Sequence, residues 1–121
     1  MNARTAMKIS LAAAVGLLVA ASTPDSHAAV DKKIERLWKA KCASCHGADG
    51  KGATEQGKKN HAEDMTNKEW QKAKTDADMR DAILKGFKRT KDGVEQKMEP
   101  LKDGTPEQAD QLIALIRGLS T

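Results

Sequence analysis

Two cysteines and a histidine form the most chemically specific stretch of the chain. Cys42 and Cys45, the only cysteines in the sequence, are separated by two residues, and His46 follows directly. A C-x-x-C-H string is the attachment motif of c-type haem. In that chemistry each thiol forms a thioether to one vinyl group of the porphyrin, and the imidazole supplies an axial nitrogen to the iron. The motif therefore predicts one covalent haem c, bound by Cys42, Cys45 and His46.

The same thiol spacing also occurs in thiol–disulfide exchange pairs and in zinc sites. A zinc site needs further cysteine or histidine residues at ligand spacing, and beyond the N-terminal region the only other histidine is His61. A thioredoxin-like pair would lie in a βαβ pattern, and the sequence contains no such pattern. Haem attachment is therefore favoured over a bare dithiol.

The first 28 residues have the pattern of a cleavable secretory signal. Arg4 and Lys8 precede an uncharged apolar run over residues 9–21, and a short polar stretch then ends in Ser26-His27-Ala28. This run is too short to span a bilayer as a permanent helix, although an uncleaved anchor is the alternative. No cysteine follows it that could carry a lipid. We expect export to a bacterial periplasm, where haem is attached, with no permanent membrane anchor.

Cleavage after Ala28 leaves residues 29–121, which are predicted to form a single domain. The mature chain carries a formal charge of +3 and has only three aromatic side chains, Trp38, Trp70 and Phe87. So small a domain has little apolar area to bury by itself. Because a haem would supply the missing apolar bulk, the composition fits a domain built around a cofactor.

The segments that must position the motif have the pattern of helices and loops, with no strand-like alternation. The first helix is predicted to begin near Asp31, as its N-cap, and to run into the cysteines. From Gly47 to Asn60, four glycines predict a flexible loop. Thr66 to Glu69 form a capping-box pattern, which predicts a short helical turn that positions Trp70.

A middle helix and a terminal helix follow. Thr75 is predicted to open a helix that ends at Gly86. The polar stretch from Lys88 to Lys97, which contains Asp92-Gly93, is predicted to be a loop. The terminal helix has the clearest start, because Thr105-Pro106-Glu107-Gln108 combines an N-cap, a proline in the first turn and a capping-box glutamine. Its apolar stripe consists of Ala109, Leu112, Ile113 and Ile116.

Taken together, these features resemble the small class I c-type cytochromes, over essentially the whole mature chain. The resemblance depends on Cys42-Ala43-Ser44-Cys45-His46 and the glycine-containing stretch 47–52, on Trp38 four residues before the first cysteine, and on a late Met98 followed by the terminal helix. It implies an all-α fold in which the N- and C-terminal helices cross over a covalently bound haem, with a middle helix and long loops. It also implies a monohaem cytochrome of the bacterial periplasm.

The chain departs from the pattern of this family at three places. The glycine usually found eight residues before the first cysteine is Ile34 here. The proline whose carbonyl usually accepts the proton of the proximal histidine is absent, so we expect another backbone carbonyl between residues 47 and 59 to orient His46. Finally, Met98-Glu99-Pro100 replaces the usual Met-Pro.

Met98 is the predicted sixth ligand of the iron. It lies ahead of Pro100, where the chain can turn and present a thioether. His61 is the main rival, because imidazole also binds haem iron. Met65 and Met79 compete on residue type alone, and Met79 falls on the apolar stripe of the middle helix, where a methionine is more often core than ligand.

An iron with two protein ligands has no open position for oxygen or peroxide. The expected function is therefore soluble one-electron transfer without catalytic turnover, so we do not expect an enzyme. Two alternatives stay open. The chain could be the haem subunit of a larger oxidase or dehydrogenase, or a ligand-binding sensor or peroxidase-like protein with a labile sixth ligand. Peroxide chemistry would need a distal acid–base pair, and His61 would have to serve alone.

Charge near Met98 suggests how a redox partner protein would dock. Between positions 85 and 102 the chain has six basic residues and three acidic ones, the basic ones being Lys85, Lys88, Arg89, Lys91, Lys97 and Lys102. Such a stretch would attract an acidic partner, and a charged surface that serves only solubility is the alternative. We expect a monomer, and we expect no nucleic-acid binding because there is no arginine cluster.

Overall fold

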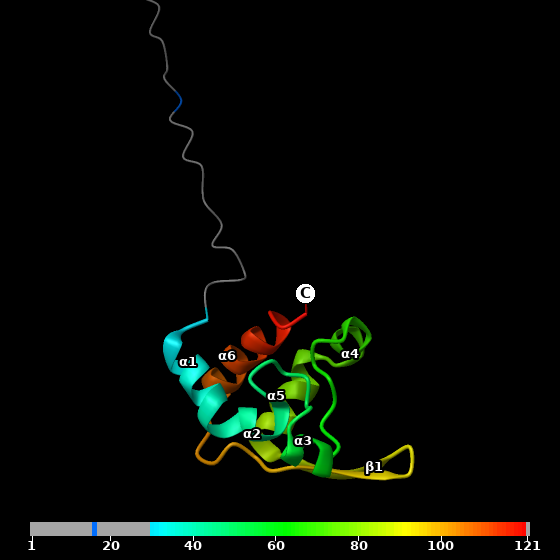
Figure 1. Ribbon diagram of the computed structural model, residues 1–121. Helices are drawn as coiled ribbons and strands as arrows, with labels where there is room; N and C mark the ends of the chain where they lie inside the picture. Colours follow the sequence, from blue (N-terminus) through cyan, green and yellow to red (C-terminus); the bar gives the residue numbers. More distant parts are fainter. Residues whose placement is uncertain (1–15, 17–29, 121) are drawn as a thin grey trace, which may run out of the picture.

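The computed structural model describes Gly16 and residues 30–120, and its first and last helices pack against each other (Figure 1). The predicted signal over residues 1–28 and its cleavage site lie outside the described residues, apart from Gly16. A cap begins the first helix as expected, since the side chain of Asp31 accepts a hydrogen bond from the backbone N–H of Lys33 at 3.0 Å.

The haem-binding motif lies at the end of one continuous helical stretch. Helix α1 (Lys32–Leu37) continues through a π-helical turn, η1 (Trp38–Cys42), into the short helix α2 (Ala43–His46). A π-helical turn carries one extra residue per turn, and such turns are frequent at functional sites. The stretch ends at Gly47, whose φ of +79° favours glycine.

Residues 47–60 contain a helix that the glycine count did not predict. Helix α3 (Glu55–Lys59) is capped by Thr54, whose side chain accepts from the backbone N–H of Gly57 at 2.9 Å. Gly57 lies inside this helix because a Cβ there would overlap the carbonyl oxygen of Cys45. The prediction of a flexible loop was therefore wrong over α3, where this glycine allows close packing onto the haem-binding motif.

Helices α4 (Lys68–Ala73) and α5 (Asp76–Lys85) start near the predicted positions. Asn67, and not Thr66, caps α4, with its side chain accepting from the backbone N–H groups of Glu69 and Trp70. The Thr66 hydroxyl donates instead to Asp64. The cap of α5 is as predicted, because Thr75 and Asp78 form a reciprocal capping box.

A β-hairpin occupies the stretch that was predicted to be a loop, and that prediction was wrong. Strand β1 (Phe87–Lys91) pairs antiparallel with β2 (Val94–Met98), from Phe87 opposite Met98 to Lys91 opposite Val94. Asp92 and Gly93 form the two-residue turn and both have positive φ, which is the primed turn that hairpins favour. The strands were not recognised because both of their faces carry polar side chains.

Helix α6 (Pro106–Arg117) forms the centre of the core. Its predicted capping box between Thr105 and Gln108 is present, and the helix packs against both α1 and α5. The core cluster consists of Ile34, Trp38, Met65, Met79, Ile83, Ala109, Leu112, Ile113 and Ile116. The predicted helical architecture, with the terminal helices in contact and α5 as a middle helix, is confirmed, and the hairpin is an addition to it.

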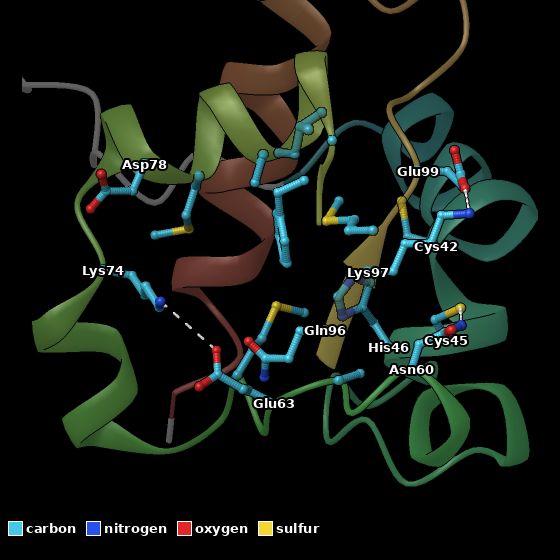
Figure 2. A pocket seen from close by; sticks show the side chains of 18 of the residues that line it. Cys42, Cys45, His46, Asn60, Glu63, Lys74, Asp78, Gln96, Lys97 and Glu99 are labelled. Carbon is cyan, nitrogen blue, oxygen red and sulfur yellow. Dashed lines mark hydrogen bonds and ion pairs between the residues drawn. The ribbon is translucent and has the colours of Figure 1, made fainter. Parts of the chain in front are cut away.

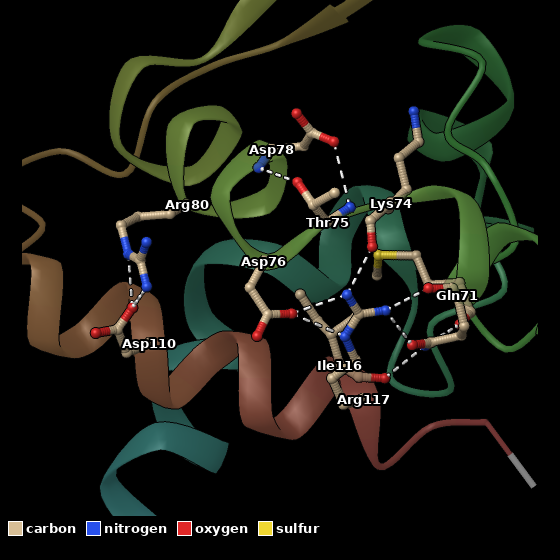
Figure 3. A network of polar contacts seen from close by, with 10 residues as sticks. Gln71, Lys74, Thr75, Asp76, Asp78, Arg80, Asp110, Ile116 and Arg117 are labelled. Atoms are coloured by element: carbon tan, nitrogen blue, oxygen red, sulfur yellow. Dashed lines mark hydrogen bonds and ion pairs between the residues drawn. The ribbon is translucent and has the colours of Figure 1, made fainter.

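Arg117, at the C-terminal end of α6, connects this helix to α4 and α5 (Figure 3). Its guanidinium donates to the carboxylate of Asp76 at 2.8 and 3.0 Å, to the side-chain oxygen of Gln71 at 3.0 Å and to the carbonyl of Lys74 at 2.6 Å. Because one planar side chain serves three segments, it fixes α4 and α5 against the end of α6.

Candidate haem site

A cavity of about 900 Å³ lies between the motif helix α2, helix α5 and the hairpin, and Figure 2 shows it from close by. Both cysteines and His46 line one side of it. The other lining side chains come mainly from segments that are distant in the sequence, namely the loop after α3, helix α5 and the hairpin. The cavity therefore brings together all the residues that sequence analysis singled out as haem-binding candidates, which are Cys42, Cys45, His46, His61, Met65, Met79 and Met98.

Both cysteines are free thiols at the border of this cavity and are partly buried. Burial, with an added contribution from neighbouring Cys45, raises the pKa of the Cys42 thiol to about 11. Asn60 holds the second thiol, since its side-chain amide lies 3.8 Å from the sulfur of Cys45. Redox-active dithiols depend on a lowered thiol pKa. The thiol environment therefore weighs against the dithiol-exchange alternative.

His46 is held by the indole of Trp38, with ring centroids 5.8 Å apart and an angle of 30° between the ring planes. Burial lowers the pKa of His46, which favours the neutral imidazole. The neutral ring is the form that binds metals. Its Nδ1 atom is buried and has no hydrogen-bond partner among the described residues.

The expected backbone acceptor for His46 is therefore not found, and that prediction was wrong. The first carbonyl of the 47–59 range, that of Gly47, accepts the indole N–H of Trp38 at 3.2 Å instead. The carbonyl of Cys45 accepts from the hydroxyl of Thr54. Sequence analysis noted the position of Trp38 but could not assign this hydrogen bond, because it depends on the fold of the turn at Gly47.

The candidates for the sixth ligand differ in their surroundings. Met98 is half-buried at the end of β2 and lines the cavity. Met65 and Met79 also reach the cavity but are 4% and 5% exposed and belong to the core cluster. His61 is exposed, has a φ of +53°, and its carbonyl accepts a hydrogen bond from the side chain of Gln96 at 3.0 Å. This arrangement favours Met98.

One border of the cavity is polar, and sequence analysis did not identify it. The carboxylate of Glu63 receives the indole N–H of Trp70 at 3.2 Å and forms ion pairs with Lys74 at 3.8 Å, with Arg89 at 3.5 Å and with Lys91. Burial alone would raise the pKa of Glu63, but the bonds from Lys91 and Trp70 and the charge of Lys74 outweigh it and lower this pKa. Three cations surround one carboxylate, so this border has a net positive charge.

A cytochrome c family model matches residues 32–120.

The chain belongs to the cytochrome c family.

Among solved structures it is similar to the KustC0563 c-type cytochrome, with a TM-score of 0.59 and 28% sequence identity, over 72% of this chain and 96% of that chain. No curated protein matches the sequence. Family and structural similarity together mean that this protein has the class I cytochrome c fold, a covalently bound haem c and a role in haem-based electron transfer.

The residues around the cavity of this cytochrome fit a haem. A neutral imidazole that lines the cavity suits a metal ligand, and two free thiols that line the same cavity suit thioether formation. Apolar side chains from α5, including Met79 and Ile83, line the cavity between these groups and the polar border. Over the described part of the chain, no three His, Cys, Asp or Glu side chains group to hold a different metal ion.

The basic stretch of the cytochrome is largely paired with acids. Arg89 and Lys91 bond to Glu63, while three exposed pairs join Lys85 to Asp81, Lys88 to Glu95 and Lys97 to Glu99. Of the six basic residues between positions 85 and 102, Lys102 is the one that forms no ion pair with the described residues 30–120. In that same range no helix is long and apolar enough to cross a membrane.

Proposed function

We propose that this cytochrome is a soluble periplasmic electron carrier whose iron is bound by His46 and Met98, with thioethers to Cys42 and Cys45. The observation that supports it most is that these four residues, from the motif helix and from the end of the hairpin, border one cavity. When bound, the haem supplies an iron that alternates between the ferric and ferrous states. The proposal includes removal of residues 1–28 as a secretory signal and a single monomeric domain over residues 29–121.

The proposed axial residues have distinct roles. His46 would bind as a neutral imidazole, kept neutral by burial and oriented by the ring of Trp38. Met98 would present a soft, uncharged thioether, which raises the reduction potential relative to a second histidine. With both sides of the iron closed, neither oxygen nor peroxide has a position to occupy. The proposal is therefore electron transfer without catalytic turnover.

The polar border would hold the carboxylates of the haem. Lys74 and Arg89 both line the cavity, and each has further N–H donors beyond those bound to Glu63 that an anion can accept. The resident carboxylate of Glu63 keeps these donors together in the fold. Because their net charge is positive, they would also stabilise the reduced haem, which has one positive charge fewer than the oxidised haem.

An acidic redox partner would dock on the hairpin side of the cavity. Exposed ion pairs are worth little and are readily exchanged, so Lys85, Lys88 and Lys97 can leave their acidic neighbours for a partner's carboxylates. Arg89 and Lys91 are bound to Glu63 and are therefore less available. Lys102 completes the proposed docking surface.

The purified mature protein tests the function directly. We expect a low-spin haem spectrum in both oxidation states, a reversible one-electron wave, only slow binding of carbon monoxide, and haem that stays on the polypeptide after acid–acetone extraction. The Cys42→Ser variant with Cys45→Ser should lose this attachment. Extractable haem in the wild type, or catalytic peroxide turnover at the rate of a peroxidase, would contradict the proposal.

A further inference from the structure

Gly86, at the C-terminal end of α5, lies unusually close to the segment that contains Met98. A Cβ atom on Gly86 would lie 2.5 Å from the carbonyl oxygen of Met98 and 2.8 Å from the ring nitrogen and Cδ of Pro100. The φ of Gly86 is +64° and its ψ is −176°, a combination that essentially only glycine adopts. Both the contact and the backbone angles therefore require a residue without a side chain.

The hairpin fixes which way Met98 faces. Met98 pairs with Phe87, the residue that directly follows Gly86, and Gln96 pairs with Arg89. These four positions line the cavity and are the buried or half-buried ones of the two strands, as the period of two along a strand predicts, while the exposed Lys97 also borders the cavity. Gln96 is 8% exposed, accepts from Nε of Arg89 at 2.9 Å and donates to the carbonyl of His61 at 3.0 Å. The side of the hairpin that faces the cavity is therefore hydrogen-bonded, through Gln96, to the loop that contains His61.

A second contact attaches the chain beyond Met98 to the core. The backbone N–H of Leu101 donates to the carbonyl of Ile83 at 2.7 Å. Ile83 belongs to the core cluster, and its helix packs on α6. The segment from Met98 to Leu101 is thus fixed at both ends. At its start, Met98 pairs with Phe87 and contacts Gly86. At its end, Leu101 is hydrogen-bonded to Ile83 of α5.

We propose that Gly86 is a positioning residue for the sixth ligand, and that its close contact with the Met98–Pro100 segment keeps the Met98 thioether on the iron. This inference depends on the proposed ligation by Met98. A side chain at position 86 would push the carbonyl of Met98 away from α5, and the sulfur would move with it. The iron–sulfur bond would then open more often, without any change in the motif that attaches the haem.

The chain provides a matched control for this test. Gly93, in the hairpin turn, also has a positive φ (+77°), but a Cβ there would meet nothing within 4 Å. Both Gly86→Ala and Gly93→Ala impose backbone strain, which is larger at Gly86 because of its ψ of −176°, and only Gly86→Ala adds an atom against Met98. In the holo-protein, we expect Gly86→Ala to weaken the far-red band of sulfur-bound ferric haem and to speed carbon monoxide binding to ferrous haem by on the order of tenfold.

Gly93→Ala should keep the band and bind carbon monoxide within about twofold of the wild-type rate, because its cost is confined to the turn. Equal effects of the two alanines, or an unchanged band and rate in Gly86→Ala, would overturn the positioning role. Met98→Ala separates this failure from a failure of the ligand assignment. If the wild type has no sulfur band, or Met98→Ala retains it, both the ligation and this inference are wrong.

Pro100→Gly provides a second test that adds no atoms, in case Gly86→Ala does not fold. It removes the ring that packs at Gly86 and frees the backbone after Met98. We expect faster carbon monoxide binding with the helical circular dichroism and the covalent haem unchanged. A wild-type binding rate in Pro100→Gly would contradict the proposed role of the contact.

Discussion

Trp38 stacks on the imidazole of His46, with centroids 5.8 Å apart, and donates its indole N–H to the carbonyl of the next residue along, Gly47, at 3.2 Å. One buried side chain thus packs against the candidate iron ligand and closes the turn that follows it. The tryptophan also belongs to the core cluster with α6. The terminal helix and the haem-binding motif are therefore connected through this residue.

Trp38→Phe tests the hydrogen bond apart from the ring. Phenylalanine keeps an aromatic ring near His46 but removes one of the two donors to the carbonyl of Gly47, the other being the backbone N–H of Gly50 at 3.2 Å. Loss of this hydrogen bond should lower the free energy of unfolding by about 0.5–1.5 kcal/mol. Urea denaturation of the ferric protein measures this difference. The control is Trp70→Phe, since Glu63 keeps its lysine and arginine partners when the indole N–H of Trp70 is lost. An equal or larger loss of stability in the control would contradict this assignment.

The helix starts could be predicted from the sequence because their signals are local. Asp31, Thr75 and Thr105 each accept a hydrogen bond from an N–H only two or three residues away, so side-chain type and spacing suffice. The Cys42–His46 motif is equally local, since covalent attachment fixes the spacing of its residues. These features identified the fold class and three residues of the candidate site.

What sequence analysis missed depends on contacts between distant segments. Gly57 was assigned to a loop because the group that excludes a side chain there, the carbonyl oxygen of Cys45, lies twelve residues away in the sequence. The hairpin was missed because Arg89 and Gln96 face the cavity and remove the usual apolar alternation, although Asp92-Gly93 is a strong turn signal. The Glu63 cluster joins three separate segments, the loop after α3, helix α4 with its C-cap and strand β1, and no local pattern indicates it.

Met98→Ala and His61→Ala decide between the two candidates for the sixth ligand. Loss of the thioether should abolish the far-red band, lower the reduction potential and open the iron to carbon monoxide and cyanide. His61→Ala should change none of these, because the His61 side chain is exposed and only its backbone carbonyl is bonded to the hairpin. Optical spectra and voltammetry of the two variants provide the comparison. If His61→Ala changes the coordination while Met98→Ala does not, the haem is bis-histidine and the assignment is wrong.

The docking surface can be tested on an anionic electrode that stands in for an acidic partner. Lys88→Glu with Lys97→Glu should weaken adsorption on a carboxylate-coated electrode and slow electron exchange there at low salt. The effect should fade as the screening length shortens to about 8–10 Å at moderate ionic strength. Lys68→Glu is the control, since Lys68 is exposed on α4 and does not line the cavity. Equal weakening by Lys68→Glu would indicate a net-charge effect without a defined docking surface.

The capping box of α5 should make stability depend on pH in acid. Hydrogen bonds from the side chain and backbone of Thr75 lower the pKa of Asp78 below its ordinary value of 3.8. A carboxyl whose pKa is lower in the folded state stabilises the fold above the unfolded-state pKa, and this contribution is lost as the pH falls through the folded-state value. Asp78→Ala should therefore lower the melting temperature at pH 7, and the difference from wild type should shrink below pH 3.8.

Asp81→Ala is the matched control in the same helix, because Asp81 only pairs with the exposed Lys85. Exposed pairs of this kind contribute little to stability. At pH 7 the melting temperature of Asp81→Ala should therefore lie closer to that of the wild type than the melting temperature of Asp78→Ala does. Thermal unfolding followed by circular dichroism between pH 2.5 and 7, a range of about one unit or more on either side of the carboxyl pKa, measures all three proteins. A gap between wild type and Asp78→Ala that stays constant over this range would mean that the charge of Asp78 plays no part in the cap.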